Sequence, residues 1–207
     1  MKSKFATAFL VLCALAVSGQ AAQKGKKKVA PRDYANTLAV LQTDMGDITL
    51  KFYYDKAPKH VENFVDLAAK GFYDGTMFHR VIPGFMIQAG DPLTKKAEDP
   101  RRPYGTGGNV GPDGKEVRIK AEFNDTTHKR GVLSMARASD PNSASSQFFV
   151  VVKDSPFLDH QYTAFGEVVS GMEVADKIAA APRNASDRPN QPIRIKKVVL
   201  SQAKSLS

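Results

Sequence analysis

The stretch FHRVIPGFMIQAGDP, from Phe78 to Pro92, combines features that a single central β-strand rarely tolerates. The apolar residues on both sides read as strand, but Arg80 and the pair Pro83-Gly84 interrupt them. Proline cannot donate to a β-ladder, and arginine is almost never fully buried without a partner. The stretch therefore raises the question of what requires a fixed cation beside apolar side chains on a rigid sheet.

The surrounding sequence predicts a β-rich domain that begins near Thr37. Residues 37–43 and 47–54 are apolar strand candidates, and Asp44-Met45-Gly46 between them is a hairpin signal. Further strands are expected at Met77–Val81, Phe85–Gln88, Val132–Ala136, Gln147–Val152, Thr163–Val168 and Arg194–Ser201.

Two short helices are expected among these strands. In residues 57–71 apolar side chains recur at the i, i+3, i+4 and i+7 spacing of a helix, with Pro58 at its start and Gly71 just past its end. Residues 171–182 show a second helical pattern, which stops at Pro182. Antiparallel strands with only two helices indicate a closed barrel or a sandwich, and not a βαβ sheet.

The N-terminus has the order of charges and apolar residues that is typical of a signal peptide. Lys2 and Lys4 precede an apolar run over residues 5–17, which is shorter than the roughly 20 residues of a spanning helix. An uncleaved anchor is the alternative. The only cysteine, Cys13, lies in this run, which rules out thiol catalysis in the mature chain. We expect a signal peptide at 1–22, a basic polar linker at 23–36 and the folded domain at 37–203.

This leader predicts an exported protein, periplasmic or secreted, with no stable membrane insertion once the leader is removed. The formal net charge is +9, and the lysines of the leader and of Lys24–Lys28 precede the domain. A short basic run beside a leader is usually a solvated linker. No ladder of aromatic and basic residues follows it, so we expect no nucleic-acid partner.

Several kinds of chemistry find no support in the motifs. The four histidines have no metal-ligand spacing, and there is no G-x-S-x-G nucleophile elbow. Residues 93–118 form a long polar loop that contains the GTGG of Gly105–Gly108, but no Gly-Lys-Ser/Thr follows as in a phosphate-binding loop. An enzyme with this sequence is therefore expected to use no metal, no cofactor and no nucleophile.

The motifs FHRVIPGFMIQAGDP, GTGG, GVLSMARA, NSASSQFFV, FLDHQYTAFGEV and GMEVADKI occur in this order. With these motifs in this order, the chain resembles the cyclophilin-type peptidyl-prolyl cis-trans isomerases, and the resemblance extends from about Thr37 to Ala203. The resemblance implies a closed antiparallel eight-stranded β-barrel with two short α-helices. It also implies an enzyme that accelerates X-Pro bond rotation in exported proteins, assists their folding, takes proline-containing polypeptides as clients and acts as a monomer.

The resemblance also assigns site residues. The catalytic arginine of the family falls on Arg80. The apolar proline pocket falls on Phe85, Met86, Phe149 and Leu158, with Phe157 and Tyr162 at its edge. The polar floor falls on Gln88 and Gln147, the substrate-pairing backbone on Ala136, Arg137 and Ala138, and the rim of the neighbouring subsite on Gly105.

Three of these positions depart from the family pattern. Arg137 stands where many members have asparagine, and the added cation is expected to alter which residues beside the proline are preferred. Tyr162 replaces a frequent histidine. Phe157 stands where eukaryotic members usually have a tryptophan that donates a hydrogen bond to cyclosporin, and phenylalanine has no donor. We therefore expect cyclosporin to bind with weakened affinity.

The implied chemistry explains why an arginine interrupts the strand. Rotation of an X-Pro bond breaks amide resonance, with a barrier of roughly 18–20 kcal/mol. A fixed donor aimed at the prolyl nitrogen stabilises the twisted state selectively, and arginine offers a permanent charge on a rigid fork. The alternative is a binding module that holds proline-containing segments without turnover.

Overall fold

The computed structural model of the chain describes residues 33–96 and 103–203. The described residues belong to one unit, Arg32–Ser207. The expected signal peptide at 1–22 and most of the expected linker at 23–36 lie outside them. Within the described part of the linker, Tyr34 packs on the domain, because its hydroxyl donates to Asp66 at 3.1 Å and its ring stacks on Tyr54.

The described chain folds into one antiparallel sheet of eight strands, in the spatial order β3-β4-β6-β5-β7-β2-β1-β8. Two α-helices and two 3₁₀ turns connect them. The strands are β1 (Thr37–Thr43), β2 (Gly46–Phe52), β3 (Arg80–Ile82), β4 (Met86–Ala89), β5 (Val132–Met135), β6 (Phe148–Val151), β7 (Ala164–Ser170) and β8 (Ile195–Gln202). The helices are α1 (Pro58–Ala69), η1 (Pro92–Lys96), η2 (Pro156–Leu158) and α2 (Met172–Ala179).

The sheet curls but does not close, so the expected closed barrel is confirmed only as a curled eight-stranded half-barrel. The two edge strands, β3 and β8, do not pair with each other. Only the segments that precede them meet, through an isolated bridge between Met77 and Arg194. The edge strand β3 is bonded elsewhere, because the backbone N–H of Val81 donates to the carbonyl of Asp187 at 2.8 Å.

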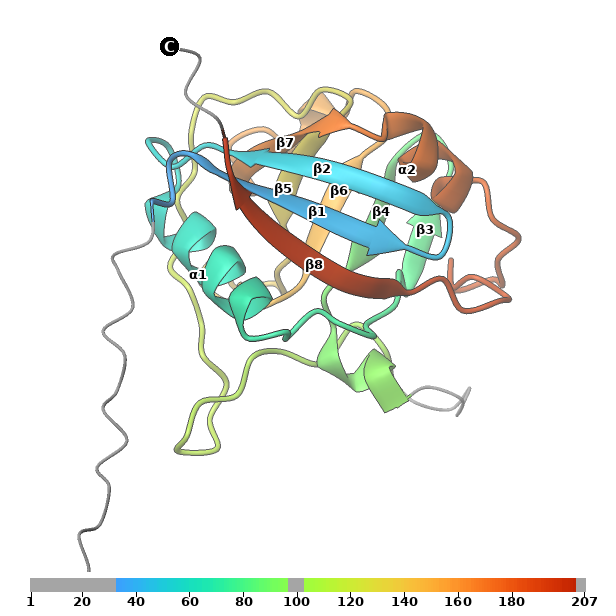
Figure 1. Cartoon of the computed structure of the whole chain (residues 1–207), viewed down its shortest axis with the longest axis horizontal. Helices are drawn as coiled ribbons and strands as arrows, with labels where there is room; N and C mark the ends of the chain where they lie inside the picture. The colour runs from blue at the N-terminus through green and yellow to red at the C-terminus, as the bar shows by residue number, and fades with distance from the viewer. Residues whose placement is uncertain (1–32, 97–102, 204–207) are drawn as a thin grey trace, which may run out of the picture. The chain divides into compact units, whose positions relative to one another are not determined.

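The main core lies inside the curl. The strands β1 and β2 alternate buried and more exposed residues, as the period of two predicts. The inward side chains pack with one face of α1 and one face of α2, including Phe64 and Ile178. Figure 1 shows the two helices at opposite ends of the curled sheet. The two α-helices thus cover the ends of the core, whereas the outer face of β4, β6 and β5 carries the 3₁₀ turn η2 with its buried Leu158.

A second, smaller apolar cluster lies on that outer face. The strands β5 and β6 are buried on both sides, so that Phe148 and Val150 face the main core while Phe149 and Val151 face the smaller cluster. A strand that is buried on both faces shows no alternation of apolar and polar residues in its sequence. The smaller cluster is the part of the fold that positions the candidate site.

The stretch 78–92 is a hairpin at the edge of the sheet. Pro83 and Gly84 form the turn between β3 and β4, where the N–H of Phe85 donates to the carbonyl of Ile82 at 3.0 Å and Gly84 has φ +70°. An edge strand and its turn tolerate proline. The strand β3 begins three residues later than the expected Met77, because residues 77–79 make their hydrogen bonds outside the β3–β4 ladder or at its end.

Candidate active site

Strand register places the polar and apolar site residues in one row. Arg80 on β3 lies opposite Gln88 on β4, Gln88 lies opposite Phe149 on β6, and Phe149 lies opposite Ser134 on β5. Residues that are directly opposite in an antiparallel sheet project from the same face. The row therefore brings a cation, an amide and an aromatic ring together on the outer face of the sheet.

A cavity of about 110 Å³ lies over this row. Its floor is apolar and buried, because Met86, Phe149 and Leu158 are each less than 10% exposed. The ring of Tyr162 meets that of Phe149 edge to face, at 5.7 Å and 85°. The residues that line the cavity are Arg80, Phe85, Met86, Gln88, Ala136, Arg137, Phe149, Leu158 and Tyr162.

Nine of the thirteen predicted site residues thus line one cavity. Gly105, Ala138 and Gln147 line an adjacent cavity of about 340 Å³, which shares Gln88, Ala136 and Arg137 with the first. The structure therefore brings twelve of the predicted residues to two joined cavities.

The thirteenth predicted residue, Phe157, lines neither cavity. Its side chain is largely exposed, at 62%, and its ring lies 5.4 Å from that of Phe85 at the rim. Phe157 is therefore placed to touch a ligand that extends beyond the smaller cavity, and not one confined within it.

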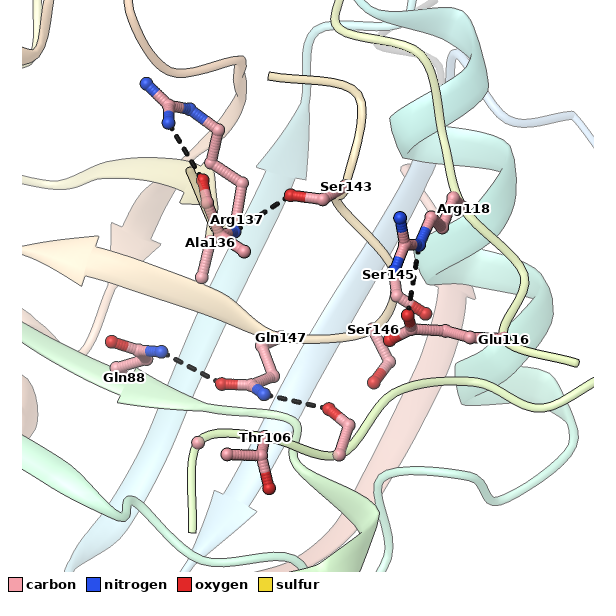
Figure 2. A pocket seen from close by; sticks show the side chains of 13 residues that line it. Gln88, Thr106, Glu116, Arg118, Ala136, Arg137, Ser143, Ser145, Ser146 and Gln147 are labelled. Atoms are coloured by element: carbon pink, nitrogen blue, oxygen red, sulfur yellow. Dashed lines mark hydrogen bonds and ion pairs between the residues drawn. The ribbon is translucent and has the colours of Figure 1, made fainter. Parts of the chain in front are cut away.

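A chain of amide hydrogen bonds forms the floor between the cavities. Gln88 Nε2 donates to Gln147 Oε1 at 2.9 Å, and Gln147 Nε2 donates to the carbonyl of Gly107 at 2.8 Å. Figure 2 shows this chain at the base of the larger cavity, with Arg137 directed away from the two glutamines. Because each amide is held by its neighbour, the side-chain orientations of both glutamines are fixed.

The glycine loop at the rim is held by Asp91, a buried residue that the sequence analysis did not single out. Asp91 Oδ2 accepts from the N–H of Gly105 at 2.6 Å, and Oδ1 accepts from the N–H of Leu93 at 2.8 Å. Gly105 has φ +88°, a conformation that favours glycine. The available sequence signal was the aspartate of the Gly-Asp-Pro that directly follows β4. A carboxylate that is buried there needs hydrogen-bond donors, and the backbone N–H groups of the neighbouring loop supply them.

The Arg137 side chain is held over Tyr162. Its guanidinium carbon lies 4.6 Å from the ring centroid, and its nitrogens donate to the carbonyls of Gln161 at 3.1 Å and Ala138 at 2.9 Å. Cation–π contact and backbone acceptors fix the direction of the charge without neutralising it. Arg137 therefore adds a positive charge at the boundary of the two cavities.

A buried histidine lies behind the apolar wall, and the sequence analysis gave it no role at the site. His128 Nδ1 lies 2.9 Å from Asp159 and Nε2 lies 3.0 Å from the hydroxyl of Ser134, while its ring stacks on Phe149 at 6.4 Å. The set resembles a Ser-His-Asp triad, but Ser134 is fully buried and also bonds to the carbonyl of Thr163. A nucleophile needs access to its substrate, so this cluster supports the wall of the cavity and performs no acyl transfer.

Neither a metal centre nor a membrane span is found in the part of the chain that the structure describes. Within residues 33–96 and 103–203, no three His, Cys, Asp or Glu side chains are grouped so that they could hold a metal ion. In the same residues no helix is long and apolar enough to cross a membrane.

An apolar cavity lined by Arg80, on the outer face of a curled antiparallel sheet, is the arrangement that the resemblance to the cyclophilins implies. The family model described as "Cyclophilin type peptidyl-prolyl cis-trans isomerase/CLD" matches residues 38–200. The chain belongs to this family and is a peptidyl-prolyl cis-trans isomerase.

Similar proteins agree with this assignment. The chain is 42% identical to peptidyl-prolyl cis-trans isomerase A of Dickeya dadantii, over 82% of this chain and 84% of that protein. It is 42% identical to isomerase ppi1 of Schizosaccharomyces pombe, over 77% of this chain and 96% of that protein. A crystal structure of a Cryptosporidium parvum cyclophilin type isomerase, determined in the presence of the dipeptide Ala-Pro, has a TM-score of 0.70 and 33% identity, and covers 80% of this chain and 99% of that one.

Proposed function

We propose that this isomerase twists the X-Pro bond without a covalent step, with Arg80 as the catalytic donor. The observation that carries the proposal is the position of Arg80. Its side chain lines the cavity with the apolar floor, and its place on β3 is directly opposite Gln88. The prolyl ring would lie on Met86, Phe149 and Leu158. As the bond twists, the prolyl nitrogen becomes pyramidal and basic, and a guanidinium N–H can then donate to it.

The apolar floor strengthens this interaction. Ring burial excludes water from one side of the twisting bond, and the lower local dielectric makes the charge of Arg80 act more strongly on it. The segment from Ala136 to Ala138 continues from the end of β5 along both cavities. We assign to its backbone the pairing with the substrate main chain, which would hold one side of the bond while the other rotates.

Replacement of the donor tests the mechanism. Arg80→Ala should lower kcat/KM for an Ala-Pro peptide by about 10²–10³-fold, the usual loss when one transition-state donor is removed. Arg80→Lys should retain only part of the activity, because lysine keeps the charge but lacks the rigid fork. The measurement is a protease-coupled assay supported by NMR exchange.

Arg130→Ala is the matched control. Arg130 is as exposed as Arg80, at 43% against 45%, and it is paired with Asp176, and neither of these two residues lines the cavities. Its loss should leave kcat/KM near the wild-type value. A folded Arg80→Ala protein with near-wild-type turnover would refute the proposed mechanism.

The physiological clients that we propose are proline-containing segments of exported polypeptides, whose folding the enzyme assists. The Ala-Pro dipeptide used with the Cryptosporidium relative supports the substrate class. The leader over residues 1–22 supports export to the periplasm or the medium, and we expect a monomer. N-terminal sequencing of native protein that found Met1 retained in a membrane fraction would contradict export by a cleaved leader.

A further inference from the structure

The loop between α2 and β8 reaches the catalytic edge of the sheet. Figure 1 shows it leaving α2 and passing the region of β3 before it enters β8. The carbonyl of Asp187 accepts the N–H of Val81 at 2.8 Å, one residue after Arg80. The loop is therefore attached to β3 beside the catalytic residue.

Asp187 has an unusual backbone conformation. Among the described residues only Asp187 and His160 combine a side chain other than glycine's with a positive φ, and Asp187 has φ +60°. Its turn is held by Asn184, whose carbonyl accepts the N–H of Asp187 at 3.0 Å and whose Oδ1 accepts the N–H of Arg188 at 3.1 Å. Such conformations persist where the surrounding structure requires them, and they are concentrated at functional sites.

The carboxylate of Asp187 lies between two arginines. Its Oδ1 lies 3.2 Å from Arg183 Nε, and its Oδ2 lies 3.7 Å from Arg80 Nε. Among the described residues it is the only carboxylate within ion-pair distance of Arg80. Because the pair engages the Nε edge, the two terminal amino groups of the Arg80 guanidinium remain available to a substrate.

We propose that Asp187 is a positioning residue that orients the Arg80 guanidinium toward the smaller cavity. This inference rests on the proposed catalytic role of Arg80. Arginine has many rotamers, and a side chain that is 45% exposed would sample several of them without a partner. A half-exposed ion pair contributes little to the stability of the fold, so its main effect is on geometry. Arg183 shares the carboxylate, and the cluster keeps a net positive charge at the cavity mouth.

The test is removal of the carboxylate while the loop is kept. Asp187→Asn retains a residue that tolerates positive φ, and Asp187→Gly removes the side chain while fitting the same backbone. Each variant should lower the catalysed exchange rate of a saturating Ala-Pro peptide about tenfold, because a misplaced group near the reacting bond is costly. The KM and the Tm should stay near their wild-type values.

Asp176→Asn is the matched control, since Asp176 also pairs with a half-exposed arginine, Arg130, and neither residue lines the two cavities. It should leave the exchange rate unchanged. An NMR readout is independent of turnover: the Nε–H resonance of Arg80 should shift in Asp187→Asn and stay in place in Asp176→Asn. If both Asp187 variants fold and retain wild-type rates, the inference is overturned.

A double-mutant cycle separates an effect through Arg80 from a general effect of the loop. Lysine has no Nε edge, so Asp187→Asn should cost little further activity in an Arg80→Lys background. An equal tenfold loss in that background would show that Asp187 does not act through Arg80. Active Arg80→Ala protein would instead refute the catalytic role of Arg80, whereas inactive Arg80→Ala with active Asp187→Asn would overturn the inference alone.

Discussion

Phe157 is the residue at the cavity rim whose lack of a hydrogen-bond donor should most affect the binding of a large ligand. Its side chain is exposed and stands beside Phe85, so it offers apolar surface to a large ligand but no hydrogen-bond donor. The carbonyl of Phe157 already accepts from Gln161 Nε2 at 2.9 Å, which fixes the local backbone. A larger ring can therefore replace Phe157 without disturbing the core.

Phe157→Trp is expected to strengthen the binding of cyclosporin. An indole N–H that faces a ligand carbonyl adds a hydrogen bond worth roughly 0.5–1.5 kcal/mol, and more where that carbonyl is otherwise left dry. Each 1.4 kcal/mol is about tenfold in affinity. Calorimetry should show part of a ten- to hundredfold gain, with isomerase activity retained. The control is Phe123→Trp, at another exposed phenylalanine. Equal cyclosporin affinities for Phe157→Trp and wild type would show that Phe157 does not determine the affinity, and Arg137 and Tyr162 would then be the residues to replace.

At Gly166 the strand β7 leaves no room for a side chain. Gly166 lies opposite Phe52 on β2 and Leu133 on β5. A Cβ at this position would meet the backbone oxygen of Lys51 and would lie 3.3 Å from the Leu133 side chain. A glycine in a strand often marks such a close approach of another backbone, and here it lets β7 pair with both β2 and β5 without a clash.

Gly166→Ala should therefore destabilise the protein by about 1–3 kcal/mol, the typical cost of overpacking. The control is Gly111→Ala, because a Cβ there meets first the side chains of Asp113 and Val117, which can move. Its effect should stay within about 0.5 kcal/mol, as for most surface substitutions. Urea unfolding of both variants measures the difference, and equal stabilities would show that the sheet at β7 is more compliant than the structure indicates.

Three buried histidines connect the stability of the domain to pH. Burial lowers the pKa of His60, His79 and His128 below the ordinary value of 6.5, although nearby carboxylates such as Glu122 and Asp159 partly oppose this. In the unfolded chain these histidines take up protons as the pH falls through 6.5, whereas in the folded chain they do so only at lower pH. Protonation therefore favours the unfolded state in this window.

The Tm should accordingly be highest above pH 6.5 and should fall as the pH decreases through the lowered pKa values of the folded state. Replacement of one of the three, His128→Gln, should reduce the slope of Tm against pH. Calorimetric scans from pH 7.5 to pH 5 measure it; a Tm that rises on acidification would contradict the assigned shifts.

The local elements and most of the site were predictable because each has a short-range signal. Apolar runs on both sides of the Asp44-Met45-Gly46 hairpin signal identified β1 and β2 to within two residues, and Pro83-Gly84 marks the turn between β3 and β4. Twelve of the thirteen predicted site residues meet at the two cavities, because the ordered motifs of a family carry its strand register with them. The strands β5 and β6 gave only continuous apolar runs, since both their faces are buried.

The tertiary structure was needed for features that join segments far apart in the chain. Whether the curled sheet closes depends on how β3 and β8 approach each other, and the loop at Asp187 takes the N–H of Val81 that a closed ladder would use. The same loop brings a carboxylate to Arg80, and His128 meets Asp159 behind the cavity wall. Neighbouring residues determine a strand or a turn, whereas an ion pair or a buried hydrogen bond forms only where the whole topology brings its two partners together.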